Sequence, residues 1–205
     1  MVKDRSTVQN ALPRPGRADV SDPSAPASEE SVVAATCQWL EQAVIGLNLC
    51  PFARAPYVKG RVRFRVSAAV DEDQLVADLA EELGRLAATD AEEIETTLLI
   101  HPQVLGDFLD FNDFLEIADA TVQALGLEGE LQVASFHPDY QFADAQAEAI
   151  ENCTNRSPFP TLHLLREASI DRAIEAVADT DEIYRRNIDT LRALGWEGWA
   201  ARCGR

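Results

Sequence analysis

The stretch Thr96-Thr97-Leu98-Leu99-Ile100-His101-Pro102 is a run of apolar and β-branched residues that ends in His-Pro. A second run of this kind, Leu131-Gln132-Val133-Ala134-Ser135-Phe136-His137-Pro138, places its histidine 36 residues further along the chain. Such runs predict β-strands, and the proline ends each one. If both strands run parallel in one sheet, His101 and His137 emerge at its carboxyl edge, where open α/β sheets commonly hold ligands. We therefore expect a functional site at this edge.

Two further strands are expected around these runs. Residues 61–69 alternate between apolar and polar, mostly basic, side chains, a pattern typical of a half-buried strand at the edge of a sheet. The run 161–166 predicts a fourth strand. The strand at 96–101 is apolar on both faces and is therefore expected at the centre of the sheet.

The helices are predicted from apolar periodicity and capping residues. Asp71 with Gln74 resembles a capping box, and a stripe of leucines follows it: Leu75, Leu79, Leu83 and Leu86. Another helix, the third along the chain, is expected from about residue 105 to 125, with Gly126 as the residue that ends it. Its buried positions are expected to be Phe108, Phe111, Leu115, Ala118, Val122 and Leu125.

The ends of the chain differ in character. Residues 1–27 hold four of the ten prolines and no periodic apolar pattern, which predicts a disordered tail before a single domain at 28–205. A first helix should begin at Ser28 or Ser31 and stop before Pro51. Its apolar stripe is expected at Val33, Cys37, Leu40, Val44 and Leu47. Two helices, near 169–178 and 181–194, should close the domain.

This order of elements predicts an α/β fold. A helix is followed by a β-α-β-α-β unit, a long connection at 138–160, a fourth strand and two helices, which together favour a single-domain sandwich of about four strands. Right-handed crossovers would make the first three strands parallel. The direction of the fourth strand stays open. If it is antiparallel, its beginning, with Asn155, Arg156 and Ser157, lies beside the two histidines; if it is parallel, that segment lies at the opposite end.

The charge of the chain argues against some partners. The 205 residues carry a formal net charge of −17, from 35 acidic and 18 basic side chains. Nucleic acid and anionic membranes would repel such a surface, so neither is expected as a partner. We find no apolar run long enough to span a membrane and no signal peptide, which predicts a cytoplasmic protein with free thiols. The basic stripe Arg61, Arg63 and Arg65 is expected to pair with acidic side chains.

Cys50, His101 and His137 are the candidate catalytic residues. Imidazole can act as a general base or acid near neutral pH, and a cysteine thiolate can act as a nucleophile if a positive group lowers its pKa. A purely structural role is the alternative for all three: each histidine would bind a loop carbonyl, and Cys50 would be a buried core residue. His163, among leucines in the middle of a strand, is expected to be a hydrogen-bonded core histidine.

A metal site is a second interpretation. His101 and His137 with Asp107 and Asp110, or with Cys50, offer ligands that suit manganese, iron or zinc. The two aspartates have an alternative role, because carboxylates near a helix N-terminus are favourable for capping and for the helix dipole. No other cofactor is predicted, since phosphate-loop, dinucleotide-binding and metalloprotease motifs do not occur in the sequence.

The segment Asn155, Arg156 and Ser157 is the candidate substrate-binding loop. A guanidinium can bind a carboxylate or phosphate through two parallel hydrogen bonds, and its polar neighbours would orient it. The alternative is a turn-rich loop packed by Phe159.

These same segments carry a resemblance to a known family. The chain resembles a group of bacterial and plant proteins that share a conserved domain of unknown function, and the resemblance covers nearly everything after residue 30. The matching motifs are Ile45–Ala53, His101–Asn112, Phe136–Phe142 and Thr154–Arg166. The resemblance implies no activity, but its motifs fall on the candidate residues and also on His163.

Taken together, the sequence favours a compact cytoplasmic α/β enzyme acting on a small, anionic metabolite. Cys50, His101 and His137 would supply the chemistry and Arg156 would bind the substrate. Two alternatives stay open: a metal-binding protein that uses histidine and carboxylate ligands, and a non-enzymatic module whose acidic face binds a basic partner. The substrate and the oligomeric state are not predicted.

Overall fold

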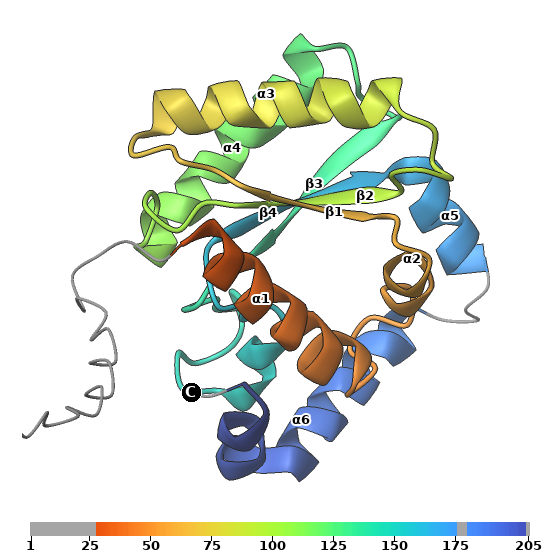
Figure 1. The fold of residues 1–205 in the computed structure, drawn as a ribbon. Helices are drawn as coiled ribbons and strands as arrows, with labels where there is room; N and C mark the ends of the chain where they lie inside the picture. Colours follow the sequence, from red (N-terminus) through yellow and green to blue (C-terminus); the bar gives the residue numbers. More distant parts are fainter. Residues whose placement is uncertain (1–27, 176–179, 204–205) are drawn as a thin grey trace, which may run out of the picture.

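A four-stranded sheet forms the centre of the protein (Figure 1). The computed structural model describes residues 28–175 and 180–203, so the tail predicted at 1–27 lies outside the described residues. The strands are β1 (Val62–Val66), β2 (Thr96–Ile100), β3 (Leu131–Phe136) and β4 (Thr161–Arg166), and their order in the sheet is β1-β2-β4-β3.

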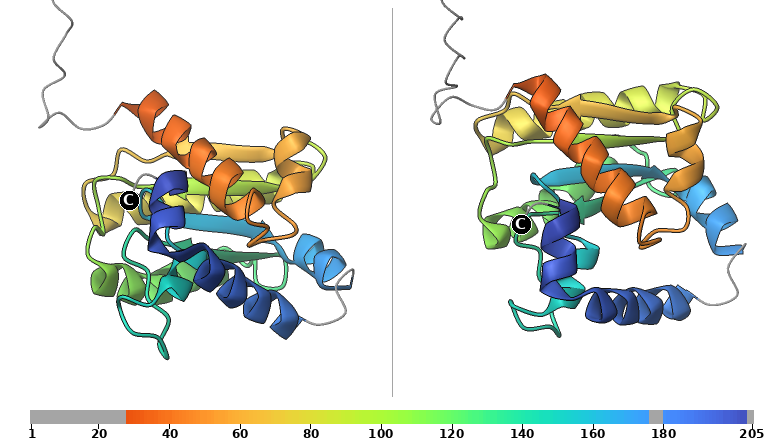
Figure 2. Two further views of the ribbon diagram at one scale, coloured as in Figure 1. Left: turned by 90° about the horizontal axis from the view of Figure 1, so that it is seen from below. Right: turned by 60° about the horizontal axis from the view of Figure 1, so that its bottom comes forward.

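Helices cover both faces of the sheet, as Figures 1 and 2 show. Helices α3 and α4 pack on one face, and α1, α2 and α6 lie on the other. The helices are α1 (Glu29–Trp39), α2 (Arg54–Val58), α3 (Glu72–Ala88), α4 (Phe108–Ala124), α5 (Glu167–Glu175) and α6 (Thr180–Cys203), with a π-helical turn η1 (Leu40–Ile45) after α1 and a 3₁₀ turn η2 (Ile150–Thr154) before β4.

The sheet is mixed, so the prediction of a mostly parallel sheet is wrong. Strands β1 and β2 pair in parallel, but β4 is antiparallel to both β2 and β3 and lies between them. The three strands expected to be parallel do run in one direction, yet β2 and β3 are not neighbours. The long connection at 137–160 lets the chain turn back, and β4 then completes the hydrogen bonding of both flanking strands. The expected positions of β1 at an edge and β2 at the centre are confirmed.

Alternation along the strands separates the two faces. Leu99, Leu162 and Leu164 point into the core beneath α3 and α4, where they pack with Phe111 and Phe114. Leu98 and Ile100 point to the other face and pack with Val32 of α1. Neighbouring residues of a strand therefore belong to different cores.

Local signals predicted α3 and the end of α4 correctly. The Asp71 carboxylate accepts a hydrogen bond from the Gln74 backbone N–H at 2.9 Å. The four expected leucines of α3 are fully buried. Gly126 follows α4 with a φ of 69°, the left-handed conformation that glycine adopts at low cost. Leu125, expected in the core, is 44% exposed because α4 ends before it.

The N-terminal helices differ from the expected pattern. Ser28 caps α1, as one of the two predicted alternatives. The predicted stripe is partly confirmed, because Leu40 and Val44 are buried, together with Val32, Thr36, Trp39 and Ala43. The other predicted positions, Val33, Cys37 and Leu47, are only partly buried. The short helix α2 was not predicted, because Pro56 lies within it; Pro56 is in the first turn, where its missing N–H has no helical partner to lose.

The basic residues of β1 pair with acidic residues of α3, as expected. Arg63 donates two hydrogen bonds to the Glu82 carboxylate, at 2.7 and 2.9 Å, and Glu82 is only 1% exposed. Burial alone would raise the pKa of Glu82, but the hydrogen bonds and charge of Arg63, together with Arg85 and Arg65, hold that pKa below its usual value. This buried ion pair joins the edge strand to the helix above it.

We expect Glu82→Gln to lower the free energy of unfolding by about 3 kcal/mol, because it leaves three arginines facing a buried neutral group. Urea denaturation at pH 7 measures this change. The matched control is Glu81→Gln on the same helix, where a side chain that is 58% exposed pairs with Arg85. The control should cost less than about 1 kcal/mol. Equal losses in the two variants would contradict the account of the Arg63–Glu82 pair.

Candidate functional site

The two His-Pro ends lie on either side of the beginning of β4. The His101 N–H donates to the Pro160 carbonyl at 3.0 Å, and the His137 N–H donates to the Asn155 carbonyl at 3.2 Å. The Ser157 N–H in turn donates to the His137 carbonyl at 3.4 Å. Of the two arrangements left open by the sequence, the structure shows the antiparallel one, with the 155–160 segment between the histidines.

Both imidazoles are fully buried and form hydrogen bonds with the backbone of a loop. His101 Nδ1 lies 3.0 Å from the Val104 carbonyl, and His137 Nε2 lies 3.2 Å from the Leu105 carbonyl. His137 Nδ1 accepts a hydrogen bond from the Asp139 N–H at 3.0 Å. These contacts correspond to the structural alternative, in which each histidine binds a loop carbonyl.

The surroundings of the two rings keep them neutral. The Phe111 ring lies between them, with centroid distances of 5.7 Å to His101 and 5.1 Å to His137. Burial lowers the pKa of His101 to about 4 and also lowers the pKa of His137. His101 Nε2 is buried without a hydrogen-bond partner among the described residues. A neutral imidazole tolerates that loss far better than a charged one.

The four candidate metal ligands do not form a metal site. Asp107 caps α4, since its carboxylate accepts hydrogen bonds from the N–H groups of Leu109 and Asp110 at 2.8 and 3.3 Å. Asp110 is exposed. Within residues 28–175 and 180–203, no group of three or more histidine, cysteine, aspartate or glutamate side chains is arranged to hold a metal ion.

The Arg156 backbone belongs to the segment between the histidines, but its guanidinium forms no hydrogen bond to His101, His137 or Cys50 among the described residues. Its Nε donates to the Tyr140 carbonyl at 3.1 Å and its Nη2 to the Ala147 carbonyl at 2.8 Å, so the guanidinium braces the long connection before β4. Its two predicted partners also contact backbone: Asn155 Nδ2 lies 3.4 Å from the Ser135 carbonyl, and Ser157 Oγ lies 2.6 Å from the Phe159 carbonyl.

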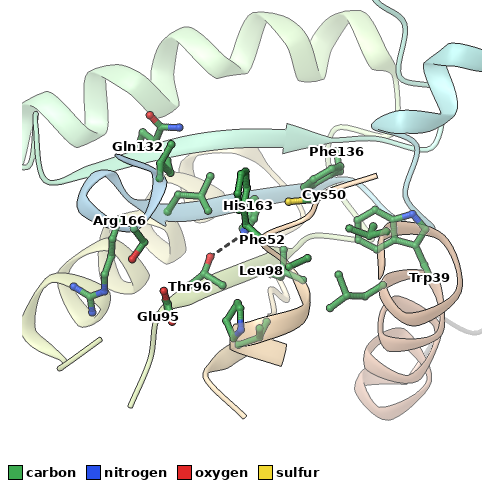
Figure 3. A pocket seen from close by; sticks show the side chains of 18 residues that line it. Trp39, Cys50, Phe52, Glu95, Thr96, Leu98, Gln132, Phe136, His163 and Arg166 are labelled. Carbon is green, nitrogen blue, oxygen red and sulfur yellow. Dashed lines mark hydrogen bonds between the residues drawn. The ribbon is translucent and has the colours of Figure 1, made fainter. Parts of the chain in front are cut away.

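Cys50 lines a cavity on the opposite face of the sheet (Figure 3). The cavity has a volume of about 290 Å³ and lies among the sheet, the end of α1 with η1, α2 and the start of α5. Its walls are mainly apolar, with Trp39, Leu98 and Phe136 among them. Figure 3 shows the Cys50 sulfur directed toward the ring of His163, which lines the same cavity.

Thr96 fixes the tautomer of His163. The Thr96 hydroxyl donates its only proton to the Leu164 carbonyl at 2.6 Å, so its oxygen must accept the 2.8 Å hydrogen bond from His163 Nε2–H. Nδ1 is then the acceptor nitrogen, and the described residues give it no hydrogen bond. Burial lowers the pKa of His163 to about 4, which keeps the ring neutral. The predicted hydrogen-bonded core histidine is therefore also a cavity residue.

Burial, two backbone hydrogen bonds and one guanidinium shift the pKa of the Cys50 thiol. Burial raises the pKa of the thiol, while hydrogen bonds from the backbone of Phe52 and Ala53 and the charge of Arg186 act to lower it. Arg186 Nη2 donates to the Asn48 carbonyl at 2.9 Å, and Asn187 Nδ2 donates to the Leu49 carbonyl at 2.8 Å. Helix α6 thus holds the loop that presents the thiol.

The two charged residues that line the cavity, Glu95 and Arg166, are already paired. Arg166 donates to the carbonyls of Leu86, Thr89 and Ile94 at distances between 2.6 and 3.3 Å. Glu95 forms ion pairs with Arg61 at 3.9 Å and with Arg172 at 3.8 Å. The cavity therefore offers a ligand a mainly apolar lining, one thiol, one neutral imidazole and the uncharged polar side chains of Gln132 and Ser169.

Strand alternation was the signal that could have identified His163. Phe136 and His137 are consecutive, so their side chains point to opposite faces, and Phe136 lies 5.7 Å from the His163 ring. A histidine between two buried leucines must point away from their core. The family motif at Thr154–Arg166 contains His163, but the sequence did not show that His163 and Cys50 lie on the same face of the sheet.

The fold and the cavity define a mixed α/β protein with a thiol and an imidazole in one apolar cavity. A family model described as "Protein of unknown function (DUF1415)" matches residues 31–201, and the chain belongs to this family. The resemblance to an uncharacterised family is thereby confirmed. Searches of curated proteins and of solved structures gave no significant match. Among the described residues, no helix is sufficiently long and apolar to cross a membrane.

We expect His101→Gln to flatten the pH dependence of stability between about pH 6.5 and pH 4. In this window position 101 is protonated in the unfolded chain, whereas the buried His101 beside Phe111 stays neutral in the folded protein. Because the unfolded state binds more protons, the wild-type protein loses stability as the pH falls. The variant should show a slope smaller by up to about 1.4 kcal/mol per pH unit. Urea denaturation across this range measures it. The two slopes should agree above pH 7, and equal slopes below pH 6.5 would contradict a neutral buried His101.

Proposed function

We propose that the protein is a thiol-dependent enzyme acting on a small, mainly apolar molecule. Cys50 would be the nucleophile and His163 the base that accepts its proton. The observation that supports this proposal is that both side chains line one cavity, although they come from the loop after η1 and from the middle of β4. Of the predicted catalytic residues the proposal retains Cys50, and it gives His101 and His137 a structural role.

The apolar lining favours a substrate without a net charge. The expectation of an anionic metabolite depended on Arg156, whose guanidinium lies outside this cavity and braces a loop. Arg166, which lines the cavity, already donates to three carbonyls. A charged ligand would lose its hydration without gaining a partner, which is costly in an apolar site.

The proposed reaction moves one proton from Cys50 to His163 and then to the leaving group. As the Cys50 S–H bond breaks, the proton passes to His163 Nδ1 and the sulfur forms a bond to an electrophilic carbon of the substrate. The leaving group then takes the proton from His163 as its own bond to that carbon breaks. In a second step, water attacks the same carbon and gives a proton to His163; the carbon–sulfur bond breaks, the hydrolysed product leaves, and His163 returns the proton to Cys50. Burial lowers the pKa of His163 and raises the pKa of Cys50, so it disfavours a separate thiolate–imidazolium pair. We therefore expect the proton transfer to accompany the attack of the sulfur on the substrate carbon.

Two residues of α6 support the thiol from outside the cavity. Asn187 is only 4% exposed, and with Arg186 it holds the carbonyls of Asn48 and Leu49 just before Cys50. Asn48 has a φ of 55°, a conformation that costs energy in a residue other than glycine. The positive charge of Arg186 also favours a thiolate at Cys50. We give these two residues a positioning role.

Alkylation by N-alkylmaleimides tests whether the cavity binds apolar molecules beside the thiol. We expect N-hexylmaleimide to react with Cys50 at least tenfold faster than N-methylmaleimide, because five added methylenes contribute up to about 0.8 kcal/mol each when buried. Peptide mass spectrometry measures the rate at each cysteine in one sample. Cys37, partly exposed on α1, is the internal control and should show little dependence on chain length. Equal dependence at Cys37 and Cys50 would contradict the proposed cavity site.

The variant His163→Gln tests the base. We expect it to slow alkylation of Cys50 by iodoacetamide at pH 7 by about tenfold or more, since glutamine cannot accept the thiol proton. The difference should shrink as the pH rises and hydroxide ionises the thiol directly. A purely structural effect of the substitution would lower the rate equally at every pH. An unchanged rate at pH 7 would remove His163 from the proposed mechanism.

A further inference from the structure

A second hollow lies between α1 and the end of α6, and we call it the α1–α6 hollow. Its volume is about 440 Å³, a size that accommodates small ligands. Its lining includes Trp39, Asp139, Arg156, Trp196, Trp199 and Arg202. Trp39 also lines the Cys50 cavity, so one indole separates the two spaces. The hollow contains Arg156, which the proposed function does not use.

A bend in α6 builds one wall of this hollow. Gly195 has a φ of 67° and a ψ of 172°, which interrupts the helix and changes its direction. Figure 2 shows the part of α6 after this bend lying beside α1. This part of α6 carries Trp196, Trp199 and Arg202. All three tryptophans of the chain consequently line the α1–α6 hollow.

Two arginines in the hollow have no carboxylate partner among the described residues. Elsewhere in the described chain, Arg63 and Arg192 pair with Glu82 at 2.7 Å and Glu151 at 2.9 Å, whereas Arg166 and Arg186 donate to backbone carbonyls. Arg156 and Arg202 form no such ion pair within residues 28–175 and 180–203, although acids outnumber bases 35 to 18 in the sequence. Asp139 lines the hollow as well, but it is paired with neither. The described lining of the hollow thus holds two arginines against one acid, and this excess of positive charge favours an anion there.

Arg156 is held rigidly in a position to bind that anion. Its Nε and Nη2 donate to the Tyr140 and Ala147 carbonyls, and its guanidinium carbon lies 5.9 Å from the centre of the Trp196 ring. A guanidinium has five N–H donors, so these two hydrogen bonds leave donors for a ligand. Because the bonds already fix the side chain, a ligand would lose little of its binding energy to ordering it.

The tryptophans add flat apolar surface next to the charges. Trp196 is 44% exposed, an unusually large exposure for an indole, whereas Trp39 and Trp199 are each 4% exposed and are fixed in the wall. An aromatic ring can stack on an exposed indole while its charged group reaches the guanidinium.

We propose that the α1–α6 hollow binds a small organic anion with a flat apolar body, the chemical class of aromatic carboxylates and aryl phosphates. This site is separate from the Cys50 cavity and does not depend on the proposed thiol chemistry. The two arginines would hold the anionic group, and Trp196 would cover the ring.

Nuclear magnetic resonance of protein labelled with ¹⁵N-tryptophan tests the proposal. Benzoate and phenyl phosphate are the two probes, benzyl alcohol is the neutral analogue and inorganic phosphate is the anion without a ring. We expect at least one aromatic anion to shift the Trp196 indole signal saturably, with affinity at least tenfold above that of benzyl alcohol and of inorganic phosphate. The stronger of the two probes identifies the anionic group as carboxylate or phosphate.

Variants assign the binding to the arginines. Arg156→Gln and, separately, Arg202→Gln should each weaken binding of the better probe about tenfold or more, while Arg192→Gln, the same change on α6 outside the hollow, should leave it unchanged. If Arg156→Gln disturbs the fold, the test depends on Arg202→Gln alone. Arg202 donates only one long hydrogen bond, 3.5 Å to the Gln42 carbonyl, so its replacement should leave the fold intact. No saturable shift with either probe, equal binding of benzyl alcohol, a shift confined to Trp39, or insensitivity to Arg202→Gln would overturn the proposal.

Discussion

Two sets of antiparallel backbone hydrogen bonds hold β4 between β2 and β3, and the arrangement of every candidate residue depends on them. Leu162 and Leu164 complete the core beneath α3 and α4, which directs His163 to the opposite face. The segment that leads into β4 accepts hydrogen bonds from the backbone of His101 and His137 and so joins the two His-Pro ends. A strand at the edge of the sheet would provide none of these constraints, because it would have only one neighbour.

The sheet separates the candidate residues into two groups with different environments. On the α3–α4 side, the imidazoles of His101 and His137 are buried around Phe111 and hold the carbonyls of Val104 and Leu105. On the α1 side, Cys50 and His163 line a cavity. Burial keeps the histidines on both sides neutral, but only His163 shares a cavity with a thiol. Neutrality therefore does not distinguish a structural from a chemical histidine; the neighbouring groups do.

Local chemistry was predictable from the sequence, and long-range placement was not. The Asp71 cap, the leucine stripe of α3 and the end of α4 at Gly126 depend on residues within a few positions of one another, and each was predicted. The insertion of β4 between β2 and β3 depends on which edges remain free after the first three strands pair, which no local pattern records. For the same reason the sequence predicted a catalytic set of Cys50 with His101 and His137, the two histidines that precede a proline. It did not predict that His163 lines the same cavity as Cys50.

The most direct test of the central claim is a crystal structure of the protein after reaction with N-hexylmaleimide. We expect the alkyl chain attached to Cys50 to occupy the cavity, in contact with Trp39 and Leu98, with His163 Nε2 still bonded to Thr96 and Nδ1 facing the modified sulfur. A chain that lies on the protein surface, with the cavity unchanged, would contradict the assignment of this cavity as the functional site.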